Sequence, residues 1–139
     1  MNAEIEELLP HRTPFLFVDD VRTEGDLIIA NHTFTEEEFF FKGHFPRYPV
    51  VPGVILVETM AQSGGAGLRK QGILAGDTLF FLASVDKVKF RRQVRPGQTV
   101  RSEITNLRVS SKMIKQAGKA YVEDEIAAEA EWLCLVGSP

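Results

Sequence analysis

The chain has almost no cysteine: Cys134 is the only one among 139 residues. A single cysteine cannot form an intramolecular disulfide, which excludes the class of small secreted domains held together by disulfides. Because Cys134 falls in a segment of alternating apolar residues, we expect a small buried hydrophobe rather than a nucleophile. The scarcity of cysteine therefore favours a reducing compartment.

Long hydrophobic runs are also missing. No segment approaches the roughly 18 consecutive apolar residues of a membrane-spanning helix. Residues 1–4 are acidic and lack the basic start and apolar centre of a secretory leader. The net charge of −3 argues against a general nucleic-acid-binding protein. Together these absences predict a cytoplasmic protein with no membrane span and no nucleic acid as partner.

Metal and nucleotide motifs are absent as well. The three histidines, His11, His32 and His44, do not have the spacing of a metal site. The glycines within 64–67 fall inside a predicted helix and do not follow a strand with dinucleotide-binding or P-loop spacing. No serine-nucleophile signature is present. The sequence therefore predicts no metal, and it leaves few side chains that could carry out chemistry.

The stretch 43–67 is the most informative part of the chain. From Pro52 to about Arg69 it is apolar nearly all round, which predicts a buried helix. Pro52 suits the first helical position, where its missing N–H group costs nothing. Glycine lowers helix propensity, so the glycines at 64, 65 and 67 indicate that another backbone approaches this helix closely.

Strand patterns surround this helix and predict an α+β fold. The segment 78–85 is apolar throughout, the pattern of a strand covered on both faces. The last segment alternates, with Ala128, Ala130, Trp132 and Cys134 inward and two glutamates outward. We expect one domain over residues 1–139. Its predicted elements are helices at 2–9 and 52–69 and strands at 14–21, 27–35, 78–85, 98–108, 115–123 and 126–136.

Between the first two strands and the helix lie two runs of three like residues. The acids at 36–38 are expected to form a solvated turn. The phenylalanines at 39–41 must be buried, either in the core or, in a second interpretation, as the wall of a ligand site. Composition alone favours the core.

Glu58 and His44 are the candidates for acid–base chemistry. Glu58 interrupts an apolar run, and burial raises the pKa of such a carboxyl so that it can donate a proton near neutrality. A neutral His44 supplies the complementary base. The N–H groups of Gly53 and Val54 at the helix start can bind an oxygen that gains negative charge. These parts suit removal of a proton next to a carbonyl and expulsion of a β-hydroxyl.

The residues alone leave a second interpretation of this pair equally open. In that interpretation Glu58 is a hydrogen-bonded core carboxylate, and His44 is a loop residue that packs on Phe45. Neither group would then touch a substrate.

Several motifs, in this order along nearly the whole chain, resemble the FabZ-type 3-hydroxyacyl-[acyl-carrier-protein] dehydratases. The resemblance implies the hot-dog fold, in which a curved antiparallel sheet wraps a long central helix. It also implies homodimers, often assembled as a trimer of dimers. The motifs are LPHRTPFL at 9–16, GHFP at 43–46, PGV at 52–54, ETMAQ at 58–62 and DKVKFR at 86–91.

The resemblance further implies a role for each site residue. His44 of one protomer faces Glu58 of the other; His44 takes the α-proton and Glu58 protonates the departing hydroxyl. The product is the trans-2-enoyl thioester on acyl carrier protein. No cofactor is implied, because elimination of water transfers no net electrons. The implied substrate-binding residues are Gly53, which binds the thioester oxygen, with Val54, Phe45, Met60 and Gln62.

A run of cations follows the apolar strand, and in the sequence only Asp86 opposes it. Strand alternation places at least three of the cations on one face. We predict that they form the docking surface for the acidic carrier protein; the alternative is a charged strand edge that prevents aggregation. The cations are Lys87, Lys89, Arg91, Arg92 and Arg95.

Two departures from the family pattern affect specificity rather than the reaction. Arg47 and Tyr48 stand where the family usually has glycine and its neighbour, and Val51 stands where methionine is common, so the acyl chain length stays open. Glu58 takes the place of the aspartate typical of dehydratase-isomerases, which argues for dehydration without isomerisation. Two alternative functions remain: a hot-dog thioesterase, and a non-catalytic acyl-carrier-binding subunit.

Overall fold

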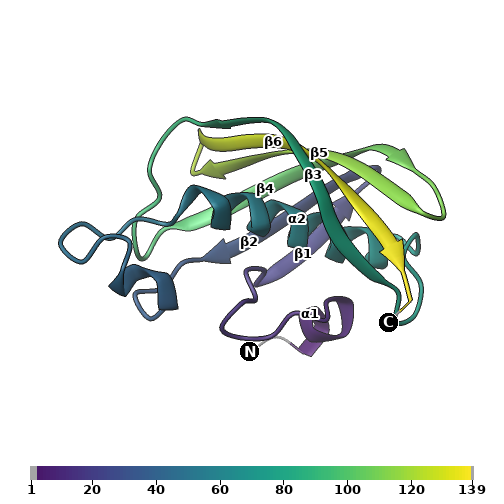
Figure 1. The fold of residues 1–139 in the computed structure, drawn as a ribbon, viewed down its shortest axis with the longest axis horizontal. Helices are drawn as coiled ribbons and strands as arrows, with labels where there is room; N and C mark the ends of the chain where they lie inside the picture. Colours follow the sequence, from purple (N-terminus) through teal and green to yellow (C-terminus); the bar gives the residue numbers. More distant parts are fainter. Residues whose placement is uncertain (1–2, 139) are drawn as a thin grey trace.

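The computed structural model describes residues 3–138, and the helix α2, Gly53–Lys70, lies at its centre (Figure 1). The predicted helix is confirmed. Pro52 is the cap residue (φ −58°, ψ 140°), one position earlier than expected. The helix is buried from Ile55 to Leu68 except at Glu58, as its apolar circumference requires. Among residues 3–138, no helix has both the length and the hydrophobicity to cross a membrane.

The described residues form one sheet of six antiparallel strands in the order β1-β2-β4-β5-β6-β3. β1–β2, β4–β5 and β5–β6 pair as hairpins, whereas β2 pairs with β4 and β3 pairs with the last strand, β6. This is the predicted α+β architecture. The strands are β1 Asp20–Glu24, β2 Leu27–Thr33, β3 Leu79–Phe90, β4 Thr99–Val109, β5 Met113–Val122 and β6 Glu125–Gly137.

The sheet curves around α2 (Figure 1). The helix contacts every one of the six strands. Strands lie about 4.8 Å apart, so a flat sheet of six would be far wider than a helix about 10 Å across. All six strands can reach one helix only if the sheet curls. The wrapped-helix arrangement of the hot-dog fold is therefore confirmed.

Three glycines of α2 allow the sheet to approach, but through side chains rather than the expected backbone. A Cβ on Gly64 would lie 2.1 Å from Oε1 of Gln116, and one on Gly65 would lie 2.1 Å from the ring of Phe80. A Cβ on Gly67 would lie 2.4 Å from Ile28. The missing side chains make room for residues of the sheet that pack directly on the helix.

The alternation predicted for the last strand is confirmed in β6. Ala128, Ala130, Trp132 and Cys134 are buried in the main core, and the two intervening glutamates point outward. Burial, and then the charge of Glu58, raise the pKa of the Cys134 thiol to about 11. The thiol therefore stays protonated, as expected of a buried cysteine.

The first predicted strand, 14–21, is wrong over most of its length. β1 begins only at Asp20. The preceding segment leaves the sheet because a buried side chain of α2 satisfies its backbone: Phe17 N–H donates to Oε1 of Gln62, and Nε2 of Gln62 donates to the carbonyl of Phe15. The predicted N-terminal helix is confirmed as α1, Ala3–Leu8, and residue 2 lies outside the described residues.

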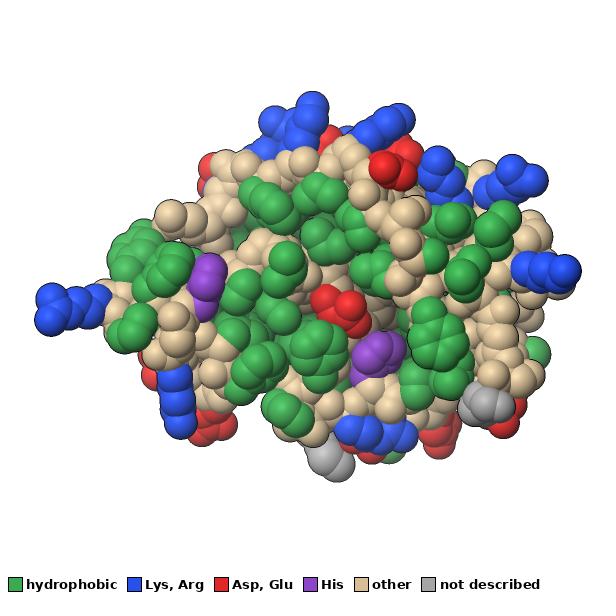
Figure 2. All heavy atoms as spheres, in the orientation of Figure 1, with side chains coloured by type: hydrophobic (Ala, Val, Ile, Leu, Met, Phe, Trp, Pro, Cys, Tyr) green, Lys and Arg blue, Asp and Glu red, His purple; other side chains and the backbone are tan. Residues whose placement is uncertain are grey.

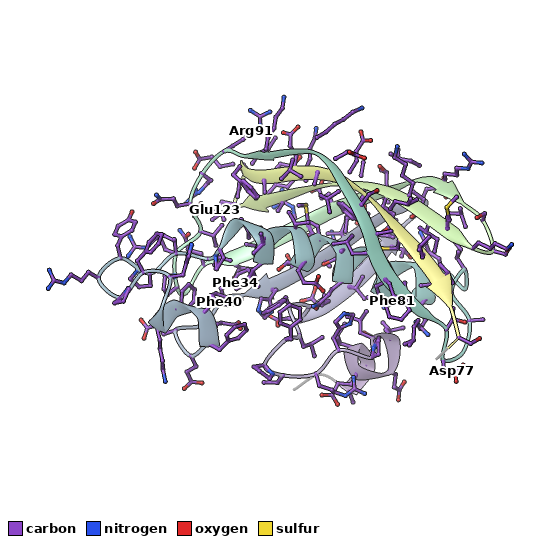
Figure 3. All side chains as sticks on the ribbon, viewed as in Figure 1. Phe34, Phe40, Asp77, Phe81, Arg91 and Glu123 are labelled. Carbon is purple, nitrogen blue, oxygen red and sulfur yellow. The ribbon has the colours of Figure 1, made fainter. Side chains whose placement is uncertain are left out.

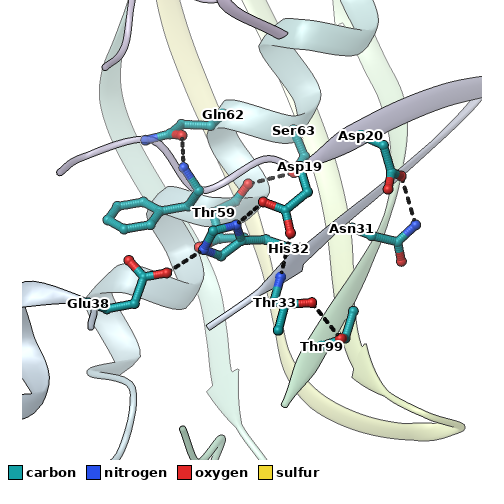
Figure 4. Close-up of polar contacts among 11 residues, drawn as sticks. Asp19, Asp20, Asn31, His32, Thr33, Glu38, Thr59, Gln62, Ser63 and Thr99 are labelled. Atoms are coloured by element: carbon teal, nitrogen blue, oxygen red, sulfur yellow. Dashed lines mark hydrogen bonds and ion pairs between the residues drawn. The ribbon is translucent and has the colours of Figure 1, made fainter. Parts of the chain in front are cut away.

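The acids and phenylalanines after β2 are also corrected. Phe40 and Phe41 are buried in the short 3-10 helix η1, Phe39–Lys42, but Phe39 is half-exposed. Glu38 is not solvated: its Oε2 bonds Nε2 of the buried His32 at 2.8 Å (Figure 4). The predicted turn is thus partly an internal ion pair.

The prediction that 78–85 is covered on both faces is wrong for the single chain. β3 is an edge strand, and its side chains are largely exposed: Phe81 is 57 %, Leu82 41 % and Phe90 53 % exposed. The apolar composition of a doubly covered strand therefore stands at an open sheet edge.

Candidate active site

Glu58 lies in the second turn of α2. Its side chain is 23 % exposed, and its Oε2 accepts a hydrogen bond of 3.0 Å from Nε2 of Gln62, one turn later. Burial raises the pKa of the Glu58 carboxyl, and the hydrogen bond from Gln62 offsets only part of that rise. The predicted proton donor therefore has the expected environment.

His44 lies in the loop between η1 and α2. Its Nδ1 is 3.1 Å from the carbonyl oxygen of Val50, which can only accept, so Nδ1 carries the proton. The Nε2 lone pair of the neutral ring is then free to act as a base. Val50 N–H donates back to the His44 carbonyl at 2.9 Å, and these two bonds fix the ring direction.

One contact supports the second interpretation of His44, that of a loop residue packed on Phe45. The His44 ring stacks on Phe45 with 4.3 Å between ring centroids. Within residues 3–138 no hydrogen bond or ion pair joins His44 to Glu58. One chain therefore holds both groups without bringing them into contact.

The histidine that accompanies Glu58 in the same chain is His11, which the sequence reasoning did not single out. Its Nε2 lies 3.6 Å from Oε2 of Glu58, and its ring packs on Phe80 with 5.9 Å between centroids. Burial, and then the nearby charge of Arg12, lower the pKa of His11. The only signal in the sequence was its place in the segment 9–16.

The start of α2 offers the two N–H groups that were expected to bind an oxygen. Ile55 and Leu56 donate to the Pro52 carbonyl. Among the described residues no backbone carbonyl accepts from Gly53 or Val54. A Cβ on Gly53 would lie 2.8 Å from the Phe90 ring, so glycine is what allows the β3 end to approach the helix start.

The other predicted substrate-binding residues are divided between surface and core. Phe45 and Val54 are exposed, whereas Met60 and Gln62 are fully buried. The structure thus places Met60 in the main core. Gln62 is held by three partners, Glu58 and the backbone at Phe15 and Phe17.

The predicted docking cations are opposed by acids that the sequence reasoning did not pair with them. Glutamates of β6 lie beside three of the five cations; the partners are Lys87–Glu131 at 3.4 Å, Arg91–Glu129 at 2.7 Å and Arg92–Glu125 at 2.6 Å. Arg91 lies on the side of the sheet away from α2 (Figure 3). The view that only Asp86 opposes them is therefore wrong.

Strand alternation does not hold over the whole cation run either. The pairing register shifts between Asp86 and Lys89, and Lys87 has φ 53°. The fifth cation, Arg95, stacks over the Tyr48 ring at 3.8 Å. These cations therefore do not form a simple row on one strand face.

Neither His44 nor Glu58 lines the depression of about 560 Å³ that lies between the N-terminal loop and η1. Its polar lining includes Asp19, His32 and Glu38. Among residues 3–138, no three His, Cys, Asp or Glu side chains are grouped so that they could hold a metal ion.

A family model described as a FabA-like domain matches residues 9–131, a span that contains His11, His44 and Glu58. The chain belongs to the FabA-like family. Curated members are similar over nearly the full length. The chain is 44 % identical over 135 residues to the 3-hydroxyacyl-[acyl-carrier-protein] dehydratase FabZ of Desulforamulus reducens, covering 96 % of this chain and 94 % of that protein.

A second FabA-like relative gives the same result. The protein of the same name from Clostridium perfringens is 43 % identical over 136 residues, covering 96 % of both chains. The identity exceeds 40 % over a span that includes both ends of α2. The match therefore does not depend on one local motif.

Solved structures support the fold of this FabA-like chain. A chain of the dehydratase heterocomplex ApeI:P from Xenorhabdus doucetiae superposes with a TM-score of 0.80 at 16 % identity, covering 99 % of this chain and 93 % of that one. A thioesterase from Haemophilus influenzae gives 0.60 at 16 % identity, covering 84 % and 76 %. At these identities the likeness concerns the fold alone.

Proposed function

We propose that this enzyme dehydrates 3-hydroxyacyl thioesters on acyl carrier protein to trans-2-enoyl thioesters in fatty-acid biosynthesis, with each site shared by two protomers. The observation that carries the proposal is Glu58, a half-buried carboxyl whose pKa burial raises within a segment matched by the FabA-like family. The full-length relatives quoted above bear the name of this dehydratase.

The open edge of β3 supports assembly into a dimer. An edge strand presents unpaired N–H and C=O groups, and a long hydrophobic edge exposes a protein to association. β3 has 12 residues and exposes Phe81, Leu82 and Phe90. In Figure 2, hydrophobic side chains gather across the face turned toward the viewer, and an acidic side chain and a histidine lie side by side near its middle. A second copy paired along β3 would cover it.

Such a pairing supplies what one chain lacks. Among residues 3–138, no hydrogen bond or ion pair joins His44 to Glu58. If the two protomers pair edge to edge, each Glu58 faces the His44 loop of its partner. The proposal includes a trimer of dimers as the higher assembly.

In the proposed reaction each of these groups has one role. His44 Nε2 takes the α-proton, and the N–H of Gly53 binds the thioester oxygen as it gains negative charge. Glu58 gives its proton, directly or through a held water, to the hydroxyl that leaves as water. No electrons are transferred to or from the substrate overall, so the proposal requires no cofactor. We place the reaction in the cytoplasm, where a lone cysteine stays reduced.

The test of the reaction is intact-mass analysis of 3-hydroxyacyl carrier proteins incubated with the purified enzyme. We expect a loss of one water from the acylated carrier. Release of the free acid with a carrier thiol would instead identify a thioesterase. No change of mass on any acyl length would identify a binding subunit.

The test of the shared site is complementation between two inactive variants. His44→Ala and Glu58→Gln are each expected to lose activity, and subunit exchange between them should restore part of it, because each mixed dimer contains one intact site. Sedimentation establishes the assembly and verifies exchange. A monomer at micromolar concentration, or no complementation after verified exchange, contradicts the shared site.

The proposed carrier docks on the cations beside β3. Rim charges act mainly on association rate and on salt dependence. The double variant Arg91→Glu/Arg92→Glu should lower kcat/KM for carrier-bound substrate and flatten its ionic-strength dependence. A short N-acetylcysteamine thioester should be turned over as before. Arg22→Glu, on the opposite edge strand β1, is the matched control, and an equal loss on both substrates contradicts docking.

A further inference from the structure

Two nitrogen atoms converge on the same oxygen of Glu58. Nε2 of Gln62 lies 3.0 Å from Oε2, and Nε2 of His11 lies 3.6 Å from it. Among residues 3–138, no side chain or backbone group donates a hydrogen bond to Oε1. The two oxygens of this carboxyl therefore have different surroundings.

The orientation of the Gln62 amide is fixed by its other partners. Its Oε1 accepts the backbone N–H of Phe17 at 2.8 Å, and its Nε2 donates to the carbonyl of Phe15 at 3.0 Å. An exchange of the amide oxygen and nitrogen would break both bonds. Gln62 is fully buried, so it presents an N–H group, never a carbonyl, to Oε2 of Glu58.

The tautomer of His11 follows from burial. Its Nδ1 is buried and has no partner among the described residues. A neutral imidazole has one N–H, and a buried N–H without an acceptor is rare and costly. Burial, and then Arg12, lower the pKa of His11 and keep it neutral. The proton therefore resides on Nε2, the nitrogen that faces Glu58.

We propose that His11 is a positioning residue that, together with Gln62, reserves Oε2 of Glu58 as an acceptor and leaves the transferable proton on Oε1. The proposal rests on the dehydratase role of Glu58 given above. A proton on Oε2 would point at two N–H groups, so Oε1 is the oxygen that can present it to the substrate.

The same arrangement supports the step itself. The proton leaves Oε1 for the β-hydroxyl, the C–O bond breaks with its electron pair on oxygen, and water departs. The carboxylate that remains has two N–H groups directed at it. The α-proton held by His44 and the proton lost by Glu58 are exchanged with solvent, which restores the starting state.

Few other titratable groups face this pair. Arg12 lies beside His11, but its guanidinium donates to the carbonyls of Leu9, His11 and Glu6. From β6, Cys134 faces Glu58 with a thiol that stays protonated below about pH 11. In the proposed dimer, His44 of the partner subunit also approaches. None of these changes when His11 is substituted.

The experiment compares His11→Phe, which keeps a ring against Phe80 but has no N–H, with His11→Gln, which keeps a donor. Carboxyl ¹³C NMR follows the titration of Glu58 in the unliganded protein, and Glu58→Gln assigns its signal. We expect the Glu58 titration to move to higher pH in His11→Phe and to return toward wild type in His11→Gln. Loss of the N–H group directed at the charged form should lower kcat in His11→Phe, by less than the roughly tenfold expected for a full hydrogen bond to a charged group, with KM little changed.

The titration needs no catalytic activity, so it separates this proposal from the proposed function. If the wild type does not dehydrate its substrate but the titration moves as described, the function fails and the positioning of Glu58 stands. If Glu58 titrates alike in all three proteins, His11 only packs on Phe80 and the proposal is overturned. An equal loss of kcat in both variants, without a shift in the Glu58 titration, would also overturn the proposal.

Discussion

Two clusters of histidine and carboxylate in this chain have opposite charge states. At the first, His11 and Glu58, burial lowers the pKa of the imidazole and raises that of the carboxyl, so both groups tend toward neutrality. At the second, the buried His32 lies between Asp19 at 2.7 Å and Glu38 at 2.8 Å (Figure 4). The second cluster is an ion-paired triad.

The difference arises from the hydrogen bonds made by the charged forms. Burial lowers the pKa of His32, but the bonds and charges of Asp19 and Glu38 outweigh burial and raise it to about 9. Burial likewise raises the pKa of Asp19, and the bonds from His32 and the Thr33 N–H reverse this and lower it. At Glu58 the N–H of His11 is directed at Oε2 from 3.6 Å, beyond normal hydrogen-bond length, so it can stabilise the carboxylate only weakly and desolvation prevails.

The comparison shows how one fold separates stability from chemistry. The triad ties the segment before β1, the strand β2 and the residue before η1 to one another. η1 in turn holds the loop of the candidate base, since His44 N–H donates to the Phe40 carbonyl at 2.9 Å. His32 is charged, and each of its ring nitrogens has a carboxylate partner, so it stabilises the structure. Glu58 has a hydrogen-bond donor at Oε2 only, among residues 3–138, and its other oxygen is left for proton transfer.

The largest effect is expected when the neutral cluster is altered. Glu58→Gln should reduce kcat/KM by about 10²–10⁴-fold, the contribution of a positioned acid. Stability at pH 7 should be unchanged or slightly higher, because glutamine has the same shape and cannot ionise. Steady-state kinetics measure the loss of activity, and thermal unfolding measures the stability. A Glu58→Gln protein that loses stability but keeps its activity would contradict the assignment of Glu58 to chemistry rather than to stability.

The next effect is a loss of stability at the triad. His32→Phe leaves two carboxylates without their counter-charge, and breaking a buried ion pair costs about 3–5 kcal/mol of unfolding free energy. Urea unfolding measures the loss. Addition of Asp19→Asn and Glu38→Gln to His32→Phe should recover part of it, and no recovery would show that the aromatic packing around His32, rather than its charge, was responsible.

The pH dependence of unfolding sharpens the same point. The folded pKa of His32 is about 9, above the roughly 6.5 of an unfolded histidine. The folded state therefore holds the proton more tightly; the stabilisation is fully present below about pH 6.5 and is lost as pH rises through about 9, by up to about 3 kcal/mol. Glu38→Gln should move this decline to lower pH, and a flat profile between pH 7 and 10 would contradict the triad.

The smallest effect is expected at an exposed pair. Arg22 and Glu24 on β1 lie 3.1 Å apart with side chains 57 % and 58 % exposed. Arg22→Ala should change the unfolding free energy by less than about 1 kcal/mol, as is usual for solvated ion pairs. Urea unfolding in parallel with His32→Phe gives the comparison, and similar losses in the two variants would mean that burial does not set the strength of these pairs.

Much of this molecule is determined by local sequence. The apolar circumference of residues 53–70 predicts α2, because a helix without a polar stripe must be buried. Period-two alternation predicts β6, because successive side chains of a strand point to opposite faces. Glu58 was identified by the same local contrast, a carboxyl within an apolar run, and His44 by its glycine, aromatic and proline neighbours.

Contacts between distant segments were decided only by the tertiary structure. Phe15–Phe17 looks like a strand, but a glutamine 45 residues later satisfies its Phe17 N–H. Glu38 looks solvated until β2 folds His32 beside it, and Lys87, Arg91 and Arg92 look unopposed until β6 supplies its glutamates. Periodicity reports which face a residue occupies, whereas a hydrogen bond or ion pair depends on what the fold places opposite that face. For this reason the sequence identified Glu58, and only the folded chain placed His11 beside it.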